Sequence, residues 1–108
     1  MPTIKRMPEF DEWLGGIKDT ITRLRLGVRL DKAQRGLMGD VKPVGGGVIE
    51  MREFFGPGWR MYYVDQNGVL IVMLGGGTKS PKAVTLPRPS RWPKPLKGSD
   101  HDFKTSKP

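Results

Sequence analysis

The stretch of sequence that decides the fold is GDVKPVGGGVIEMREFFGPGWRMYYVDQNGVLIVMLGGG, residues 39–77. Two turn signals divide it, Gly56-Pro57-Gly58 and Asn67-Gly68, because glycine and asparagine supply the positive φ angles that tight turns need. Three strands are therefore predicted, near 48–55, 59–65 and 69–74. The third is apolar on both faces, which is typical of a strand that is covered on both sides of its sheet.

The residues before this stretch predict one short strand and a first helix. The strand is expected around Thr3–Arg6, and the helix lies in PEFDEWLGGIKD, residues 8–19. Pro8 suits the first turn, where its missing N–H has no helical partner, and Gly15-Gly16 is expected to end or bend the helix. Helical spacing places four residues on one apolar face: Phe10, Trp13, Leu14 and Ile17.

A second helix is predicted from about Thr20, in TITRLRLGVRLDKAQRG, and Gly36 is expected to cap its C-terminal end. Apolar residues recur at helical spacing, at Leu26, Leu30, Ala33 and Leu37. The polar side is basic, with Arg23, Arg25, Arg29, Lys32 and Arg35. The order β-α-α-β-β-β predicts an α+β domain over residues 1–80, in which an antiparallel sheet packs on two helices.

Composition limits the class of protein. The 108 residues suffice for one small domain, and the lack of cysteine excludes disulfides and thiolate metal sites. No apolar run approaches the roughly 18 residues that a membrane span needs. The N-terminal segment MPTIKRMPEF lacks the apolar stretch of a signal peptide. We therefore expect a cytoplasmic protein, and no metal or cofactor.

The net charge of +8 is concentrated in the C-terminal tail. Residues 1–78 carry 11 Lys and Arg against 9 Asp and Glu, whereas residues 79–108 carry 8 against 2. The tail also holds six of the ten prolines, and residues 81–108 show no hydrophobic period. We expect 81–108 to be a Pro-rich basic tail that is disordered or extended. The overall charge is therefore poor evidence about the folded part.

Strand pairing across the 56–58 turn predicts a polar cluster on one face of the sheet. If Phe55 pairs with Trp59, then Arg52 pairs with Tyr62. Alternation then gives a semi-polar face made of Glu50, Arg52, Phe54, Arg60 and Tyr62. The other face is the expected core, made of Ile49, Met51, Phe55, Trp59, Met61 and Tyr63, with Glu53 as its one misfit.

On the semi-polar face, Arg52 and Arg60 are predicted to be diagonal neighbours, roughly 7–8 Å apart. Two adjacent arginines repel each other unless an anion lies between them, and the planar guanidinium suits a phosphate. Tyr62 could donate a hydrogen bond or stack on a base, and Lys42 and Lys79 could add to the same field. The alternative is a solvated face, on which Arg52 pairs with Glu50 and Arg60 pairs locally.

Three segments together resemble a known family: FDEWL, GDVKPVGGGVIEMREFFGPGWRMYYV and VLIVMLGGGTKS. The chain resembles the RelE/ParE superfamily of bacterial toxins, in the branch of phage-derived addiction-module killer proteins, which is close to the HigB-type toxins. The family pattern is G-D-x-K-x-V-G-x-G-V-x-E-x-R, then G-P-G-[YW]-R-x-Y, then an apolar strand that ends G-G-x-K-S. The match covers Phe10–Ser80, about two thirds of the chain.

The resemblance implies the toxin of a type II toxin–antitoxin pair, whose partners are a cognate helix-turn-helix antitoxin, the ribosome and mRNA. RelE- and HigB-like members cleave mRNA, usually in the ribosomal A site, whereas ParE-like members inhibit DNA gyrase. Carried over by motif, Arg60 is the first catalytic candidate, and Arg52 and Lys79 follow. Lys42 and Tyr62 are candidate RNA contacts. A non-catalytic protein that only binds gyrase or an antitoxin remains the alternative.

The tail departs from the family, which has a C-terminal helix beginning T-Q-x-x-D-I after the G-G-x-K-S motif. Loss of one base after the Ser80 codon explains the departure, because the present codons permit TQSSDIAKAIALAKTLEG in the other frame. That reading has the family opening and helical spacing of its apolar residues. We therefore hypothesise a frameshifted replacement of the helix, which would expose apolar surface and attenuate the toxin. A genuine basic arm is the alternative, and the sequence of the gene decides between them.

Overall fold

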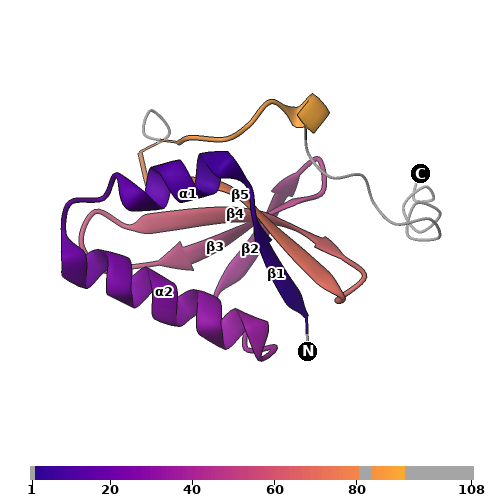
Figure 1. Ribbon diagram of the computed structural model, residues 1–108, viewed down its shortest axis with the longest axis horizontal. Helices are drawn as coiled ribbons and strands as arrows, with labels where there is room; N and C mark the ends of the chain where they lie inside the picture. The colour runs from indigo at the N-terminus through magenta and orange to yellow at the C-terminus, as the bar shows by residue number, and fades with distance from the viewer. Residues whose placement is uncertain (1, 81–83, 92–108) are drawn as a thin grey trace.

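The computed structural model describes residues 2–80 and 84–91 and confirms the α+β class (Figure 1). The N-terminal half contains β1 (Thr3–Arg6), α1 (Pro8–Gly15) and α2 (Thr20–Gln34). Four strands follow, which are β2 (Val41–Gly45), β3 (Val48–Glu53), β4 (Trp59–Gln66) and β5 (Leu70–Thr78). A short 3₁₀ turn, η2 (Pro89–Arg91), lies in the C-terminal segment. No helix in the described ranges is both long and apolar enough to cross a membrane.

The five strands form one mixed sheet in the order β1-β5-β4-β3-β2. The β3–β4 and β4–β5 pairs are antiparallel, as predicted, β2 pairs with β3 in the same antiparallel way, and β1 adds to the β5 edge in parallel. The sequence did not predict β2, because Pro43 and the following glycines disfavour a strand. Pro43 is tolerated because β2 is an edge strand, in which a missing N–H need not be paired on the outer side.

Local residues explain where both helices begin and end. Pro8 stands in the first turn of α1, which ends at the predicted glycine pair. The Asp19 carboxylate accepts the Ile21 N–H and so caps the start of α2. At the other end Gly36, with φ +87°, donates to the Ala33 carbonyl, which confirms the predicted cap. Leu37 was predicted on the apolar face, but it lies beyond this cap and is exposed.

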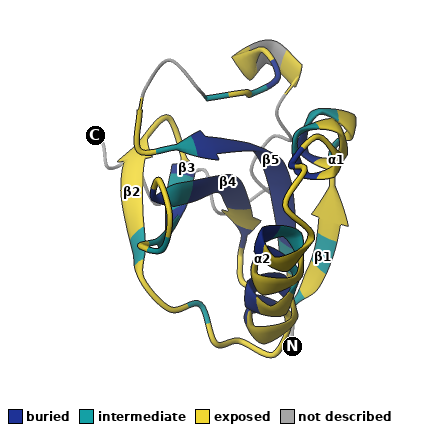
Figure 2. Ribbon diagram, turned by 90° about the vertical axis from the view of Figure 1, so that its left-hand side faces the viewer, coloured by how far each residue is buried: buried dark blue, intermediate teal, exposed yellow. Residues whose placement is uncertain are grey.

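The main core lies between the two helices and one face of the sheet (Figure 2). The predicted apolar face of α1 is confirmed, since Phe10 is fully buried and Trp13 packs against the same cluster. Gly76 of β5 lies beneath the Trp13 ring, where a Cβ would come within 2.5 Å of the ring carbons. Glycine is therefore required there for α1 to approach the sheet so closely.

A second apolar cluster lies on the opposite face of the sheet, and the C-terminal segment contributes to its cover. Val84 and Leu86 pack against this cluster, and Thr85 pairs with Gly76 through two backbone hydrogen bonds of 3.0 and 2.7 Å. A Cβ on Gly75 would be 1.8 Å from the Thr85 carbonyl oxygen, so this close approach also requires glycine.

Of the two forms predicted for the tail, disordered or extended, residues 84–88 take the extended one, with Thr85 bridged to Gly76, and η2 follows at Pro89–Arg91. The apolar surface expected to be exposed without a C-terminal helix is covered in part by Val84 and Leu86. The rest of the predicted tail, residues 81–83 and 92–108, lies outside the described residues. The frameshift hypothesis stays a prediction.

The predicted register between β3 and β4 is wrong by two residues. Glu53, rather than Phe55, pairs with Trp59, because five residues instead of three connect the strands. A shift of two leaves every side chain on the face to which it was assigned. The predicted faces are therefore correct, but Arg52 lies directly opposite Arg60 rather than on a diagonal.

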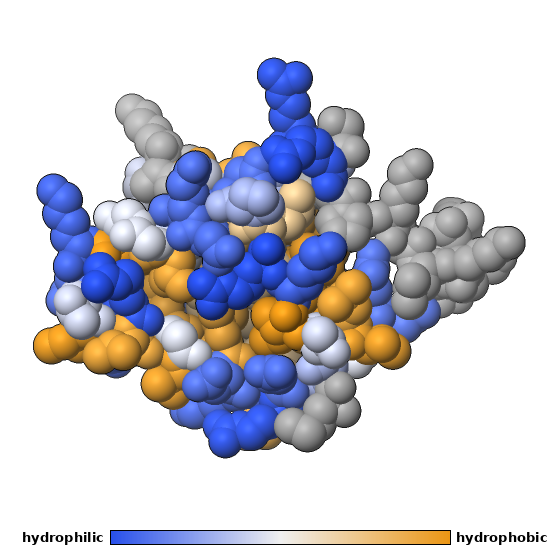
Figure 3. Space-filling model, in the orientation of Figure 1, coloured by the Kyte–Doolittle hydropathy of each residue, from blue (hydrophilic) through white to orange (hydrophobic). Residues whose placement is uncertain are grey.

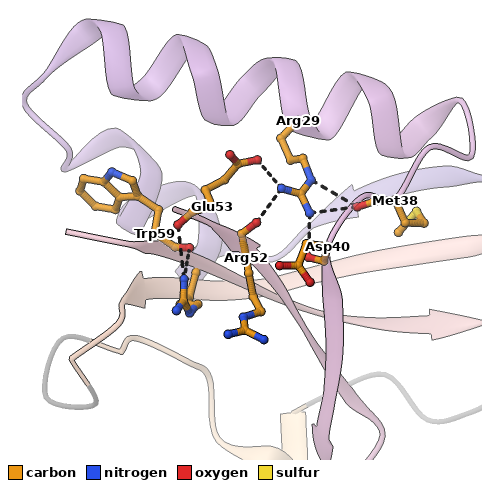
Figure 4. A network of polar contacts seen from close by, with 7 residues as sticks. Arg29, Met38, Asp40, Arg52, Glu53 and Trp59 are labelled. Atoms are coloured by element: carbon orange, nitrogen blue, oxygen red, sulfur yellow. Dashed lines mark hydrogen bonds and ion pairs between the residues drawn. The ribbon is translucent and has the colours of Figure 1, made fainter. Parts of the chain in front are cut away.

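The misfit Glu53 is neutralised by Arg29, which was wrongly predicted to be on the polar side of α2. The Arg29 side chain is buried, and its guanidinium contacts the Glu53 carboxylate (Figure 4). It also donates to three backbone carbonyls, those of Met38 at 3.0 Å, Asp40 at 2.8 Å and Arg52 at 2.8 Å. One side chain thus connects α2 to both ends of the segment that contains β2 and β3.

Replacing Arg29 with Met should lower the free energy of unfolding by about 3 kcal/mol, because it leaves the Glu53 carboxylate unpaired near the core. The double variant Arg29→Met/Glu53→Met should recover part of this loss, because it also removes the unpaired carboxylate. Recovery should be incomplete, because the three backbone carbonyls still lack their donor. Denaturant unfolding measures both values. Arg35→Met, at the exposed end of α2, is the control. An Arg29→Met variant as stable as that control would contradict the role assigned to Arg29.

Candidate functional site

Arg52 and Arg60 lie directly opposite each other on β3 and β4, on the sheet face that points away from the helices. Phe54 lies beside them, with its ring centroid 5.5 Å from the Arg52 guanidinium carbon and 5.7 Å from that of Arg60. An arginine close to an aromatic ring is partly stabilised by the ring's negative face. The sequence-predicted pair is therefore brought together, and its two charges flank one exposed aromatic side chain.

Glu50 provides the negative charge between the two arginines. Its carboxylate oxygens lie 3.8 Å from the Nε atoms of Arg52 and Arg60, and it accepts a hydrogen bond of 3.1 Å from the Tyr62 hydroxyl. The solvated-face alternative is thus partly correct, because both arginines have a local carboxylate. One carboxylate does not balance two guanidinium groups, so the face keeps a surplus of positive charge.

The two arginines differ in how firmly they are held. The Arg60 side chain is only 6% exposed, and its Nη1 donates to the carbonyls of Glu53 at 3.3 Å and Trp59 at 3.1 Å. The Arg52 side chain is 30% exposed, and its buried Nε has no hydrogen-bond partner among the described residues. Arg60 is therefore a fixed charge, whereas the Arg52 side chain is more exposed to solvent and so to an incoming anion.

A hollow of about 330 Å³ opens over this pair, and Lys79 completes its charged lining. The Lys79 backbone N–H donates to the Gly58 carbonyl at 2.7 Å, which ties the end of β5 to the 54–58 loop. Gly58 has φ +83°, and a Cβ there would lie 3.3 Å from the Lys79 Cβ. This turn conformation therefore holds Lys79 beside Arg60. Within the hollow, three cations surround a space of small-ligand size.

The two predicted RNA contacts lie next to this hollow, on the adjoining row of the sheet. Lys42 on β2 is exposed and pairs with Glu50 on β3, which in turn pairs with Tyr62 on β4. The Tyr62 ring is buried in the second apolar cluster, so stacking on a base would require it to leave that packing. Its hydroxyl is the group presented to the site.

Phe54 is the residue whose role the sequence reasoning missed, although it placed Phe54 on the correct face. This side chain is 65% exposed, beside two arginines and at the edge of the hollow. An exposed aromatic ring next to cations is a suitable platform for a nucleic-acid base. The available signal was an aromatic residue on the predicted polar face, two positions before the Gly56-Pro57-Gly58 turn.

Burial and the neighbouring Glu50 carboxylate raise the pKa of Tyr62 to about 12. Its hydroxyl therefore remains protonated at neutral pH and acts as a hydrogen-bond donor, not as a base. No group of three or more His, Cys, Asp or Glu side chains in residues 2–80 and 84–91 is placed to hold a metal ion. The chemistry that this face offers is the binding of an anion by fixed cations.

The chain is similar to an uncharacterized protein of Haemophilus influenzae, with 40% identity over 77 residues that span 71% of this chain and 78% of that protein. The chain therefore belongs to the same protein family as that relative. No protein-family model matches the chain. No solved structure shows a significant match to it either.

Both tyrosines of the chain should ionise late. Burial also raises the pKa of Tyr63 to about 12, so phenolate absorbance of the native protein should rise near pH 12 rather than near pH 10. A pKa that is higher in the folded state contributes stability below pH 10 and loses it as the pH rises towards 12. Spectrophotometric titration and unfolding at several pH values measure both effects. Ionisation of either tyrosine near pH 10 in the folded protein would contradict this burial.

Proposed function

We propose that the protein is the toxin of a type II toxin–antitoxin pair, a HigB-like member of the RelE/ParE superfamily that cleaves mRNA on the ribosome. The observation that carries the proposal is the pairing of Arg52 with Arg60 across β3 and β4, under a hollow that Lys79 completes. This arrangement suits a phosphodiester, because each guanidinium can donate to a phosphate oxygen.

The motif residues of the resemblance support the same function, because they gather at this one place. The G-P-G turn supplies Gly58, the R-x-Y segment supplies Arg60 and Tyr62, and the E-x-R segment supplies Glu50 and Arg52. These residues come from β3, β4 and the loop between them, on the sheet face away from the helices. A motif whose members meet in space is a stronger argument for a site than the sequence match alone.

In the proposed reaction a ribose 2′-hydroxyl loses its proton and its oxygen bonds to the adjacent phosphorus, while the bond from phosphorus to the 5′-oxygen breaks. The leaving 5′-oxygen takes up a proton, and a 2′,3′-cyclic phosphate remains. Negative charge builds on the phosphate in the transition state, where the fixed Arg60 is placed to stabilise it. Arg52 and Lys79 bind the same phosphate, and Lys42 contacts the RNA backbone farther along the sheet. Fixed charges are effective here because they need little reorganisation as the reaction proceeds.

The second candidate function is a toxin that binds its target without cleaving it, such as a ParE-like gyrase inhibitor. A specific observation favours it: Glu50, the carboxylate shared by Arg52, Arg60 and Tyr62, is already occupied, and no histidine lies within residues 2–80 or 84–91. Under the first proposal the ribosome therefore has to orient the 2′-hydroxyl and take its proton. Under either proposal the protein acts in the cytoplasm and is neutralised by an antitoxin with a helix-turn-helix.

Replacing Arg60 with Gln should lower mRNA cleavage in a translating bacterial extract about 100-fold, because it removes the charge that stabilises the transition state. Arg52→Gln should lower it about tenfold, since Lys79 still binds the phosphate. Primer extension on a reporter mRNA measures the cleavage. Circular dichroism of each variant verifies that the fold is intact.

Arg35→Gln is the matched control, because this exposed arginine lies at the end of α2 and outside the hollow. It should change cleavage less than about twofold. Intact mRNA in the presence of the wild-type protein, together with blocked gyrase supercoiling, would overturn the nuclease and favour the gyrase inhibitor. Intact mRNA and active gyrase would overturn both.

A further inference from the structure

A second groove runs along α2, on the helix side of the sheet, where the 54–58 loop passes the helix. It consists of two hollows of about 520 and 230 Å³ that share Arg25. Ile21, Phe55 and Trp59 line the larger hollow, and Val28 lines the smaller one. The candidate RNA site lies on the other face of the sheet.

One stripe of α2 forms the helical wall of this groove. Ile21, Arg25, Val28 and Lys32 recur at i, i+4, i+7 and i+11, so they lie above one another along the helix. The apolar members are 67% and 51% exposed. In Figure 3, apolar surface follows the lower left edge of the molecule, where α2 lies, with hydrophilic surface next to it. Apolar and cationic side chains thus alternate along the stripe, and the apolar ones are exposed to solvent.

The opposite wall of the groove is aromatic and is held in place by a cation. The Arg25 guanidinium carbon lies 3.8 Å from the centroid of the Phe55 ring, which packs against the main core. Lys18 adds a charge at the end of the groove. Of the acidic residues that line the groove, Asp19 caps α2 and Glu53 is paired with Arg29. The exposed cations of the groove are thus left without acidic partners from its own walls.

We propose that this groove binds an acidic amphipathic helix of a partner protein. The apolar side chains of such a helix would cover Ile21, Val28 and Phe55, and its carboxylates would pair with Arg25 and Lys32. A second copy of the chain would bring the same cations against these cations, which is unfavourable. RNA would satisfy the charges but would leave the exposed apolar stripe in water, so a peptide helix fits the groove better.

The proposal does not depend on the proposed nuclease, because the two sites use different cations on opposite faces of the sheet. Only Gly56 and Pro57, in the loop between β3 and β4, line hollows of both sites. The probe is a fluorescent synthetic helical peptide, with Leu at i, i+3 and i+7 on one face and Glu along both flanks. Its binding to the full chain is measured by fluorescence anisotropy. A peptide with Lys in place of every Glu, and a single-stranded RNA oligonucleotide, are the competitors.

The acidic peptide should bind, and Arg25→Glu should weaken its binding at least about tenfold by reversing a central charge. Ile21→Asp should weaken it similarly by placing a carboxylate in the apolar stripe. Both side chains are exposed, so both variants should fold, which circular dichroism verifies. Arg35→Glu and Leu37→Asp are the matched controls, because they make the same changes at exposed positions outside the groove. They should leave binding within about twofold.

Several outcomes would overturn the proposal. These are no binding of the acidic peptide, equal binding of the basic peptide, and displacement of the acidic peptide by the RNA oligonucleotide. Self-association of the chain that Ile21→Asp abolishes would assign the groove to a second copy instead. Arg25→Glu should leave mRNA cleavage unchanged and Arg60→Gln should leave peptide binding unchanged, so failure of either site is distinguishable from failure of the other.

Discussion

The rest of the structure depends on the buried guanidinium of Arg29. Its hydrogen bonds to Met38, Asp40 and Arg52 engage backbone on both sides of the β2–β3 hairpin, and its contact with Glu53 neutralises a carboxylate at the edge of the core. A buried charge is tolerated only when its donors are satisfied, and here they are satisfied by groups that must stay in place. The position of α2 therefore fixes the end of β3.

This constraint reaches the candidate site through the backbone of Arg52. Its carbonyl accepts from Arg29 on the helix side, while its side chain extends to the other face beside Arg60. Gly39, with φ +72°, makes room for the guanidinium, because a Cβ there would lie 2.9 Å from Nη2 of Arg29. Helix packing and the geometry of the arginine pair are thus coupled through one residue of β3.

The two faces of the sheet have different chemistry. The face away from the helices combines fixed cations with one shared carboxylate and suits a phosphodiester. The helix side exposes an alternating apolar and basic stripe and suits a protein helix. The toxin that we propose needs two such surfaces, one for its substrate and one for the protein that holds it inactive.

Much of this could be predicted from the sequence, because local signals were strong. Turn glycines, helix caps and alternation predicted both α-helices and every strand except β2, both faces of β3 and β4, and the cluster of Arg52, Arg60 and Tyr62. The register was wrong because loop length is set by long-range packing, of Phe55 on the core and Lys79 on Gly58, and not by the turn signal. The role of Arg29 was missed because the sequence of a helix does not distinguish a buried arginine from a solvated one. The difference lies in its hydrogen-bond acceptors, which come from residues 9–24 positions away.

The segment at 84–91 could not be predicted, since its pairing depends on two glycines of β5 that leave room for a backbone rather than on any pattern of its own. Charge and proline content allowed an extended form for this segment but did not indicate that it contacts the sheet. The role of Val84 and Leu86, which is to cover the second apolar cluster, can be recognised only from the structure of the sheet.

The most direct test of the central claim follows the arginine side chains while RNA binds. The Nε–H signals of isotope-labelled arginine are recorded by NMR during titration with a 2′-O-methyl RNA oligonucleotide, which cannot be cleaved by its own hydroxyl. The account predicts that the signals of Arg52 and Arg60 shift together and saturably, whereas those of Arg25 and Arg29 do not move. Shifts confined to Arg25, or none at Arg52 and Arg60, would contradict it.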